Sequence, residues 1–171
     1  MKERLNNRHR LSIIQQMLEM LKQLKSSGRC HNDIKPGNLL FNKLQTVRGF
    51  DVQLLLGDFG LCDKLGGTPG WSPADFTNKR EPGVSDLYSV GLVALFVLCE
   101  DEELFYAIRD NFIHPSMQQC VNGFRSLPEI QLILKMIDPV MSKRIEIEEC
   151  ANQWSNDRLN MITRRQLVDA G

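Results

Sequence analysis

Apolar residues recur at helical spacing near the start of the chain, and Gly28 follows them where a helix would end. This pattern predicts an amphipathic helix over residues 9–27. The segment 85–99 is apolar nearly all round, which is typical of a helix buried on every face at the centre of a core. Trp154 is expected to join that core.

Two short apolar runs, residues 39–41 and 52–56, predict the strands of a hairpin. The polar stretch 42–51 between them is expected to be a solvated tip. Glycine and proline are concentrated in residues 63–83, which favours an irregular loop that Trp71 ties to the core. Further helices are predicted over residues 102–111, 116–123, 128–137, 145–153 and 155–167. The fold class is therefore mainly α with one short β-hairpin.

Composition excludes several classes of function. The 171 residues carry 21 basic and 21 acidic side chains, so no overall charge draws the chain to nucleic acid or to an anionic membrane. The five cysteines are scattered and include no C-x-x-C pair, which argues against a disulfide framework and a zinc site. A reducing compartment is expected.

The chain shows no sign of export or membrane insertion. Residues 1–10 are charged and lack the apolar core of a secretory signal. The longest apolar run, residues 90–99, is shorter than the roughly 20 residues that a membrane-spanning helix needs. We expect a single domain over residues 1–171, cytoplasmic or nuclear, with His9 and His114 at its surface.

Two aspartates, Asp33 and Asp58, lie in loops beside the strands of the predicted hairpin, at positions suited to chemistry. If the hairpin pairs, Asn38 and Asp58 fall near one another and offer oxygen ligands for a hard cation such as magnesium. Asp33 is then free to orient a hydroxyl group, and Lys35 can neutralise phosphate oxygens. One aspartate in a loop is usually a turn former, but this ordered set has the parts that phosphoryl transfer needs.

The ordered motifs resemble the C-terminal lobe of a eukaryotic-type protein kinase, in a match that runs over most of residues 9–150. Residues 31–38 resemble the catalytic loop H-R-D-x-K-x-x-N. The resemblance implies that Asp33 is the catalytic base and that Lys35 steadies the transferred phosphate. It makes Asn38 a metal ligand.

The D-F-G motif of the family is found at residues 58–60. By resemblance, Asp58 holds the magnesium ion that bridges the phosphates of ATP, and His31 packs under Phe59. Leu40 stands where the family places a floor for the adenine ring. ATP and Mg²⁺ are thus the implied cofactors.

An activation segment over residues 58–75 is implied by the G-T-P-G-W-S-P-A-D stretch. Thr68 would then hydrogen-bond toward the catalytic aspartate and lysine, as in serine/threonine kinases. Asp86, in a D-x-x-S-x-G sequence, would cap the backbone of the catalytic loop. Arg144, after an Asp-Pro pair, would form an ion pair with Asp75.

The sequence also departs from the family. No glycine precedes Gly28, so no G-x-G-x-x-G loop comes before the catalytic loop, and no V-A-I-K-like strand is found. The N-terminal lobe of the family is therefore not recognised, which leaves half of a nucleotide pocket. Asn32 replaces the arginine that reads a phosphate on the activation segment, so we expect no switching by phosphorylation there. Asp75 replaces a glutamate, which shortens that side chain by one methylene.

Three functions are compatible with these residues. The first is phosphoryl transfer from Mg-ATP to serine or threonine of a protein, incomplete without a further lobe from another segment or chain. The second is a non-catalytic module that binds a regulatory partner. The third is a small-molecule phosphotransferase of the aminoglycoside or choline kinase type. Those families lack the G-T-P-G-W segment found here at residues 67–71, which argues against this function.

Overall fold

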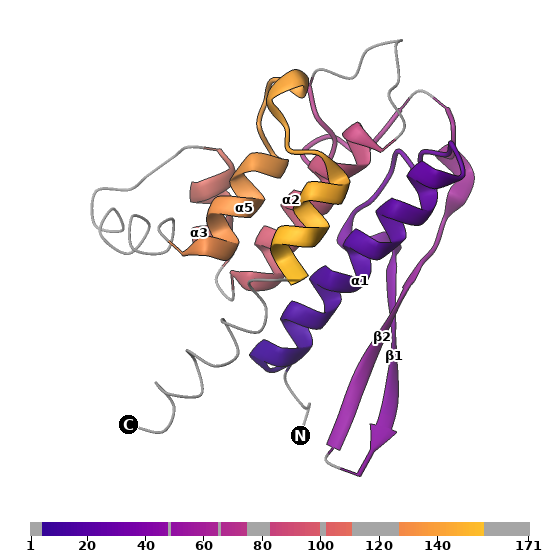
Figure 1. The fold of residues 1–171 in the computed structure, drawn as a ribbon, viewed down its shortest axis with the longest axis vertical. Helices are drawn as coiled ribbons and strands as arrows, with labels where there is room; N and C mark the ends of the chain where they lie inside the picture. Colours follow the sequence, from indigo (N-terminus) through magenta and orange to yellow (C-terminus); the bar gives the residue numbers. More distant parts are fainter. Residues whose placement is uncertain are drawn as a thin grey trace.

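A computed structural model describes residues 5–47, 49–64, 66–74, 83–99, 102–110 and 127–155 of the chain. Its elements are α1 (Asn7–Ser26), β1 (Leu39–Thr46), β2 (Gly49–Leu56), α2 (Val84–Leu98), α3 (Glu102–Arg109) and α5 (Pro128–Met136), and residues 147–155 are also helical. The prediction of a mainly helical chain with one hairpin is confirmed. Figure 1 shows the hairpin beside α1, with the other helices on the opposite side of α1.

Helix α1 begins two residues earlier than predicted because Asn6 caps it. The Asn6 side chain accepts a hydrogen bond from the His9 backbone N–H at 3.0 Å, and the His9 ring accepts from the Asn6 N–H at 3.3 Å. This reciprocal pair satisfies two N–H groups that have no partner within the helix. Near the other end of α1, Gly28 has a φ of 68°, which favours glycine after a helix.

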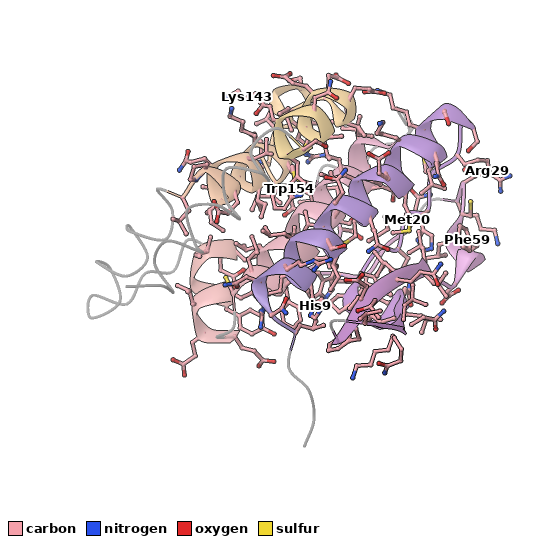
Figure 2. The ribbon with its side chains drawn as sticks, turned by 60° about the horizontal axis from the view of Figure 1, so that its bottom comes forward. His9, Met20, Arg29, Phe59, Lys143 and Trp154 are labelled. Carbon is pink, nitrogen blue, oxygen red and sulfur yellow. The ribbon has the colours of Figure 1, made fainter. Side chains whose placement is uncertain are left out.

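Helix α2 forms the centre of the core, as its all-apolar sequence predicts. It packs against α1, α3 and α5. At Gly91 the approach of the neighbouring segment is so close that a Cβ atom would lie 2.6 Å from the Cγ2 atom of Ile137. Trp154, from the last described helical residues, is fully buried as predicted, and Figure 2 shows it within the helical body.

The hairpin is longer than predicted: residues 42–46 and 49–51 belong to the strands and not to a loop tip, although residues 42–47 are exposed as expected. The antiparallel ladder runs from the Leu39–Leu56 pair to the Thr46–Gly49 pair. Backbone pairing needs no apolar side chain, so a polar stretch can continue a ladder that its apolar part begins.

The outer edge of β2 is covered by polar side chains of α1. The Gln16 amide donates to the Val52 carbonyl at 2.9 Å and accepts from the Leu54 N–H at 2.8 Å. The His9 ring bonds the Phe50 carbonyl at 2.8 Å and is buried. Because a strand edge has unpaired backbone groups, these contacts fix the hairpin to the helix. They also correct the prediction that His9 is a surface residue.

The loop after the hairpin is held as predicted by Trp71, whose ring stacks on Phe105 at 5.6 Å between centroids. The predicted helices over residues 116–123 and, after residue 155, up to 167 lie outside the described residues, as does His114. Within the described part of the chain, no helix combines the length and the apolar character needed to cross a bilayer.

Candidate active site

The hairpin brings the two predicted chemical loops to one end. Residues 31–38 precede β1, residues 58–60 follow β2, and the antiparallel pairing places both at the same end of the ladder. The Gly57 N–H donates to the Asn38 carbonyl at 2.9 Å, which joins the loops directly. Sequence positions about 20 residues apart thus become neighbours through backbone pairing alone.

Asp33 is the centre of a hydrogen-bonded cluster. Its carboxylate accepts from the Thr68 hydroxyl at 2.5 Å, from the Lys35 ammonium at 2.8 Å and from the Asn38 amide at 3.0 Å. Burial raises the pKa of the Asp33 carboxyl, but the hydrogen bonds from Lys35, Thr68 and Asn38 outweigh it and lower the pKa below its usual range. A carboxylate of this kind is charged at neutral pH.

Lys35 and Thr68 complete this cluster from two different segments. The Lys35 ammonium also donates to the Thr68 hydroxyl at 2.7 Å. The Asp33 side chain is nearly buried, whereas that of Lys35 is 28% exposed, so its ammonium can reach a ligand from solvent. The structure thus brings together a buried carboxylate, a partly exposed cation and a hydroxyl that bridges them.

Asn38 and Asp58 offer a fit for a hard cation. The Asn38 amide nitrogen donates to Asp33, which leaves the amide oxygen as the ligand atom of that side chain. Asp58 follows the Gly57 residue that is bonded to Asn38, and its carboxylate is exposed. An amide oxygen and a carboxylate suit magnesium, which keeps waters and takes phosphate oxygens as its remaining ligands. Among the described residues, no group of three or more His, Cys, Asp or Glu side chains could hold a metal ion.

The conformation of Asp58 depends on the glycine two residues later. Asp58 has a φ of 55°, and its carboxylate accepts from the Gly60 N–H at 3.2 Å. A Cβ at Gly60 would lie 3.0 Å from that carboxylate oxygen. The absence of a side chain at Gly60 therefore leaves space for the Asp58 carboxylate that its N–H bonds.

Asp86 caps the backbone of the catalytic loop, as the resemblance implies. Its two carboxylate oxygens accept from the backbone N–H groups of His31 at 2.7 Å and Asn32 at 2.8 Å. Since Asp86 is fully buried in α2, the loop is anchored to the most central helix of the fold.

His31 connects this loop to the segment after β2. Its Nδ1 atom accepts from the Asp33 N–H, so Nε2 carries the proton that is donated to the Gly57 carbonyl at 3.0 Å. The ring also contacts Phe59 edge to face, with 4.8 Å between centroids. With both ring nitrogens hydrogen-bonded, His31 holds the two loops together.

Comparison with known proteins agrees with this geometry. A family model described as the protein kinase domain matches residues 1–155. The chain belongs to the protein kinase family. It is 28% identical over 167 residues to CBL-interacting protein kinase 29 of Oryza sativa subsp. japonica, in a match that covers 91% of this chain and 37% of that protein.

Other kinases match over shorter stretches. Calcium/calmodulin-dependent protein kinase type IV of Homo sapiens is 28% identical over 123 residues, 66% of this chain and 25% of the relative. The type 1 enzyme of Caenorhabditis elegans is 30% identical over 97 residues, 52% of this chain and 27% of the relative. The kinase chain thus matches between about a quarter and two fifths of these relatives' length.

Large apolar side chains are exposed in the hairpin and at the D-F-G motif. Leu40, predicted as the adenine floor, is 58% exposed, and Leu55 opposite it in the ladder is 41% exposed. Phe59 is also exposed, and Figure 2 shows it at the rim of the molecule. Because they are paired across the ladder, Leu40 and Leu55 present apolar surface on the same face of the hairpin.

Arg144 is buried directly after the short 3₁₀ turn Met141–Lys143. Its guanidinium donates to the Asp138 carbonyl at 2.8 Å and lies 4.9 Å from the centre of the Tyr88 ring. Asp75, its predicted partner, lies outside the described residues, so the ion pair stays a prediction.

The sequence predicted no contacts for two residues of this site, Asn32 and Asp63. Asn32 bonds the backbone of the segment after D-F-G through its side chain. Asp63 joins the same segment to Cys30, through the Cys30 N–H to its carboxylate at 2.9 Å and its own N–H to the Cys30 carbonyl at 3.0 Å. Both residues have positive φ angles, and an Asn or Asp beside a glycine-rich loop is the signal that could have pointed to them.

Proposed function

We propose that the chain is the catalytic-loop part of a serine/threonine protein kinase, which transfers the terminal phosphoryl group of Mg-ATP to a protein hydroxyl. The cluster of Asp33, Lys35, Asn38 and Thr68 carries this proposal. The charged side chains of Asp33 and Lys35 and the amide of Asn38 meet at the end of the hairpin where β1 begins and β2 ends. The fold itself does not require them there. Phosphoryl transfer needs a positioned nucleophile and compensating charge at one place.

Each residue of the cluster has a role that follows from its contacts. Asp33, kept ionised, accepts a hydrogen bond from the substrate hydroxyl and takes its proton as the new bond forms. Lys35 offers its ammonium to the oxygens of the transferred group. Thr68 fixes the carboxylate by donating to it. Asn38 and Asp58 would hold magnesium, which neutralises phosphate charge when bound.

The exposed apolar side chains of Leu40, Leu55 and Phe59 support a further part of this proposal, in which they form one wall of the nucleotide pocket. A nucleotide base usually binds between two walls, so the second wall is proposed to come from another segment or another chain. Protein substrates and that second lobe are the partners we propose. A cytoplasmic or nuclear location belongs to the same proposal.

Transfer of labelled phosphate from ATP to a generic protein substrate tests this function. We expect Mg-dependent labelling of serine and threonine, alone or after fusion of a relative's nucleotide-covering lobe before residue 1. Asp33→Asn should abolish it, whereas Asp51→Asn, at a half-exposed carboxylate on β2, should not. Absence of Asp33-dependent transfer in both forms would overturn the proposal, and labelling of small alcohols alone would replace it with small-molecule phosphotransfer.

A further inference from the structure

Asn32 joins the catalytic loop to the segment after D-F-G. Its amide nitrogen donates to the Leu61 carbonyl at 3.2 Å and to the Lys64 carbonyl at 2.9 Å. Only 3% of Asn32 is exposed, so water competes little for these bonds. A buried donor that loses its acceptor is costly, and the two carbonyls are therefore held firmly.

The backbone of Asn32 is fixed from the opposite side. Its N–H donates to a carboxylate oxygen of Asp86 at 2.8 Å, and its φ is 67°. Asparagine is one of the few residues other than glycine that adopt this left-handed conformation readily. The short amide thus extends from a backbone that the central helix holds in place.

The segment returns to the catalytic loop at the next residues. A Cβ atom at Gly67 would lie 3.1 Å from the Asn32 carbonyl oxygen, and Thr68 bonds the adjacent Asp33. The loop and the segment therefore meet at two consecutive residue pairs. The side chain of Asn32 holds the segment just before this meeting point.

Asp63 provides the second link to this segment, through an ion pair with Arg29 and through hydrogen bonds with the backbone of Cys30 at 2.9 Å and 3.0 Å. Arg29 and Asp63 form an ion pair of 2.5 Å, with side chains that are 57% and 43% exposed. Exposed ion pairs contribute little to stability because solvent and salt screen them. Of the two residues whose side chains make these links to the loop, Asn32 is buried and Asp63 is exposed.

We propose that Asn32 is a positioning residue that holds residues 59–64, and through them Thr68, against the catalytic loop by neutral side-chain bonds that require no phosphate on this segment. This inference deepens the proposed function, on which its catalytic consequence rests. The tether itself can be measured without any activity.

Hydrogen–deuterium exchange of the 171-residue chain tests the tether. Asn32→Asp keeps the size and the backbone preference but turns the donor into an acceptor facing two carbonyls. We expect the bonded amides of residues 59–64 to exchange about 30-fold faster, the factor that two lost hydrogen bonds of ordinary strength supply. Asn42→Asp, the same change at an exposed residue of β1, should leave this exchange unchanged.

A merely structural role for Asn32 would raise exchange throughout the fold, including α2, whereas a tether raises it in residues 59–64 alone. Uniform acceleration, or none, would overturn the proposal. Phosphatase treatment of the wild-type chain should not change the exchange of this segment. An increase after that treatment would show that a phosphate does the holding.

The phosphoryl-transfer assay separates this inference from the proposed function. If the chain is active, Asn32→Asp should lower kcat by about tenfold or more, and it should add little to the loss in a Thr68→Val background because both act on one contact. Additive losses would contradict action through Thr68. If no variant transfers phosphate, the proposed function fails while the exchange result still decides the tether.

Discussion

Replacement of Asp86 by asparagine tests how strongly α2 anchors the catalytic loop. Asp86 is 1% exposed and accepts from two backbone N–H groups, of His31 at 2.7 Å and of Asn32 at 2.8 Å. Asparagine has the same shape, but one oxygen becomes an NH₂ group that faces a backbone N–H. One bond is lost and the other becomes neutral.

The size of the effect follows from these two bonds. A hydrogen bond to a charged group contributes about 1.5–3 kcal/mol, and roughly half of that when both partners are neutral. We therefore expect Asp86→Asn to lower the free energy of unfolding by about 3 kcal/mol. This is a large share of the roughly 5–15 kcal/mol that stabilises a typical domain.

Urea unfolding followed by far-UV circular dichroism measures this difference, with the slope against urea unchanged. The control is Asp51→Asn, which breaks a half-exposed pair with Arg8 at 3.4 Å and should cost less than about 0.5 kcal/mol. A loss below about 1 kcal/mol for Asp86→Asn would refute the reasoning. It would mean that the loop keeps its conformation without the buried acceptor.

Other substitutions and conditions test separate contacts. Gln16→Ala should lower the free energy of unfolding by about 2 kcal/mol because it leaves two backbone groups of β2 without their partners, whereas the neighbouring Gln15→Ala should cost less than about 0.5 kcal/mol in the same urea assay. Thr68→Val should slow phosphoryl transfer by about 10- to 100-fold, since it removes a hydrogen bond to a charged carboxylate. The pKa of Asp33 is lowered in the folded chain, so its stabilising contribution should be present above about pH 4 and lost as the pH falls through the folded value; Asp33→Asn should flatten that part of a plot of unfolding free energy against pH. Burial raises the pKa of the Cys150 thiol to about 12, so alkylation at pH 8 should label it only after urea unfolding.

The sequence by itself determined the elements whose pattern is local. The spacing of apolar residues located α1, and the nearly continuous apolar run located α2 as the centre of the core. Periodicity works there because one face, or every face, of a helix must be buried. The ordered motifs also marked Asp33, Lys35, Asn38 and Thr68, which the structure brings within hydrogen-bonding distance.

Only the tertiary structure decided the partners of polar side chains. The full length of the hairpin depends on α1, whose Gln16 and His9 cover the edge of β2. In the sequence, Asn32 stood out only because it replaces the arginine of the family motif. In the structure, its side chain donates to carbonyls about 30 residues away. A polar residue in a loop belongs to no periodic pattern, so the sequence does not show which groups surround it. Its role is set by which distant backbone group the fold brings within about 3 Å of it.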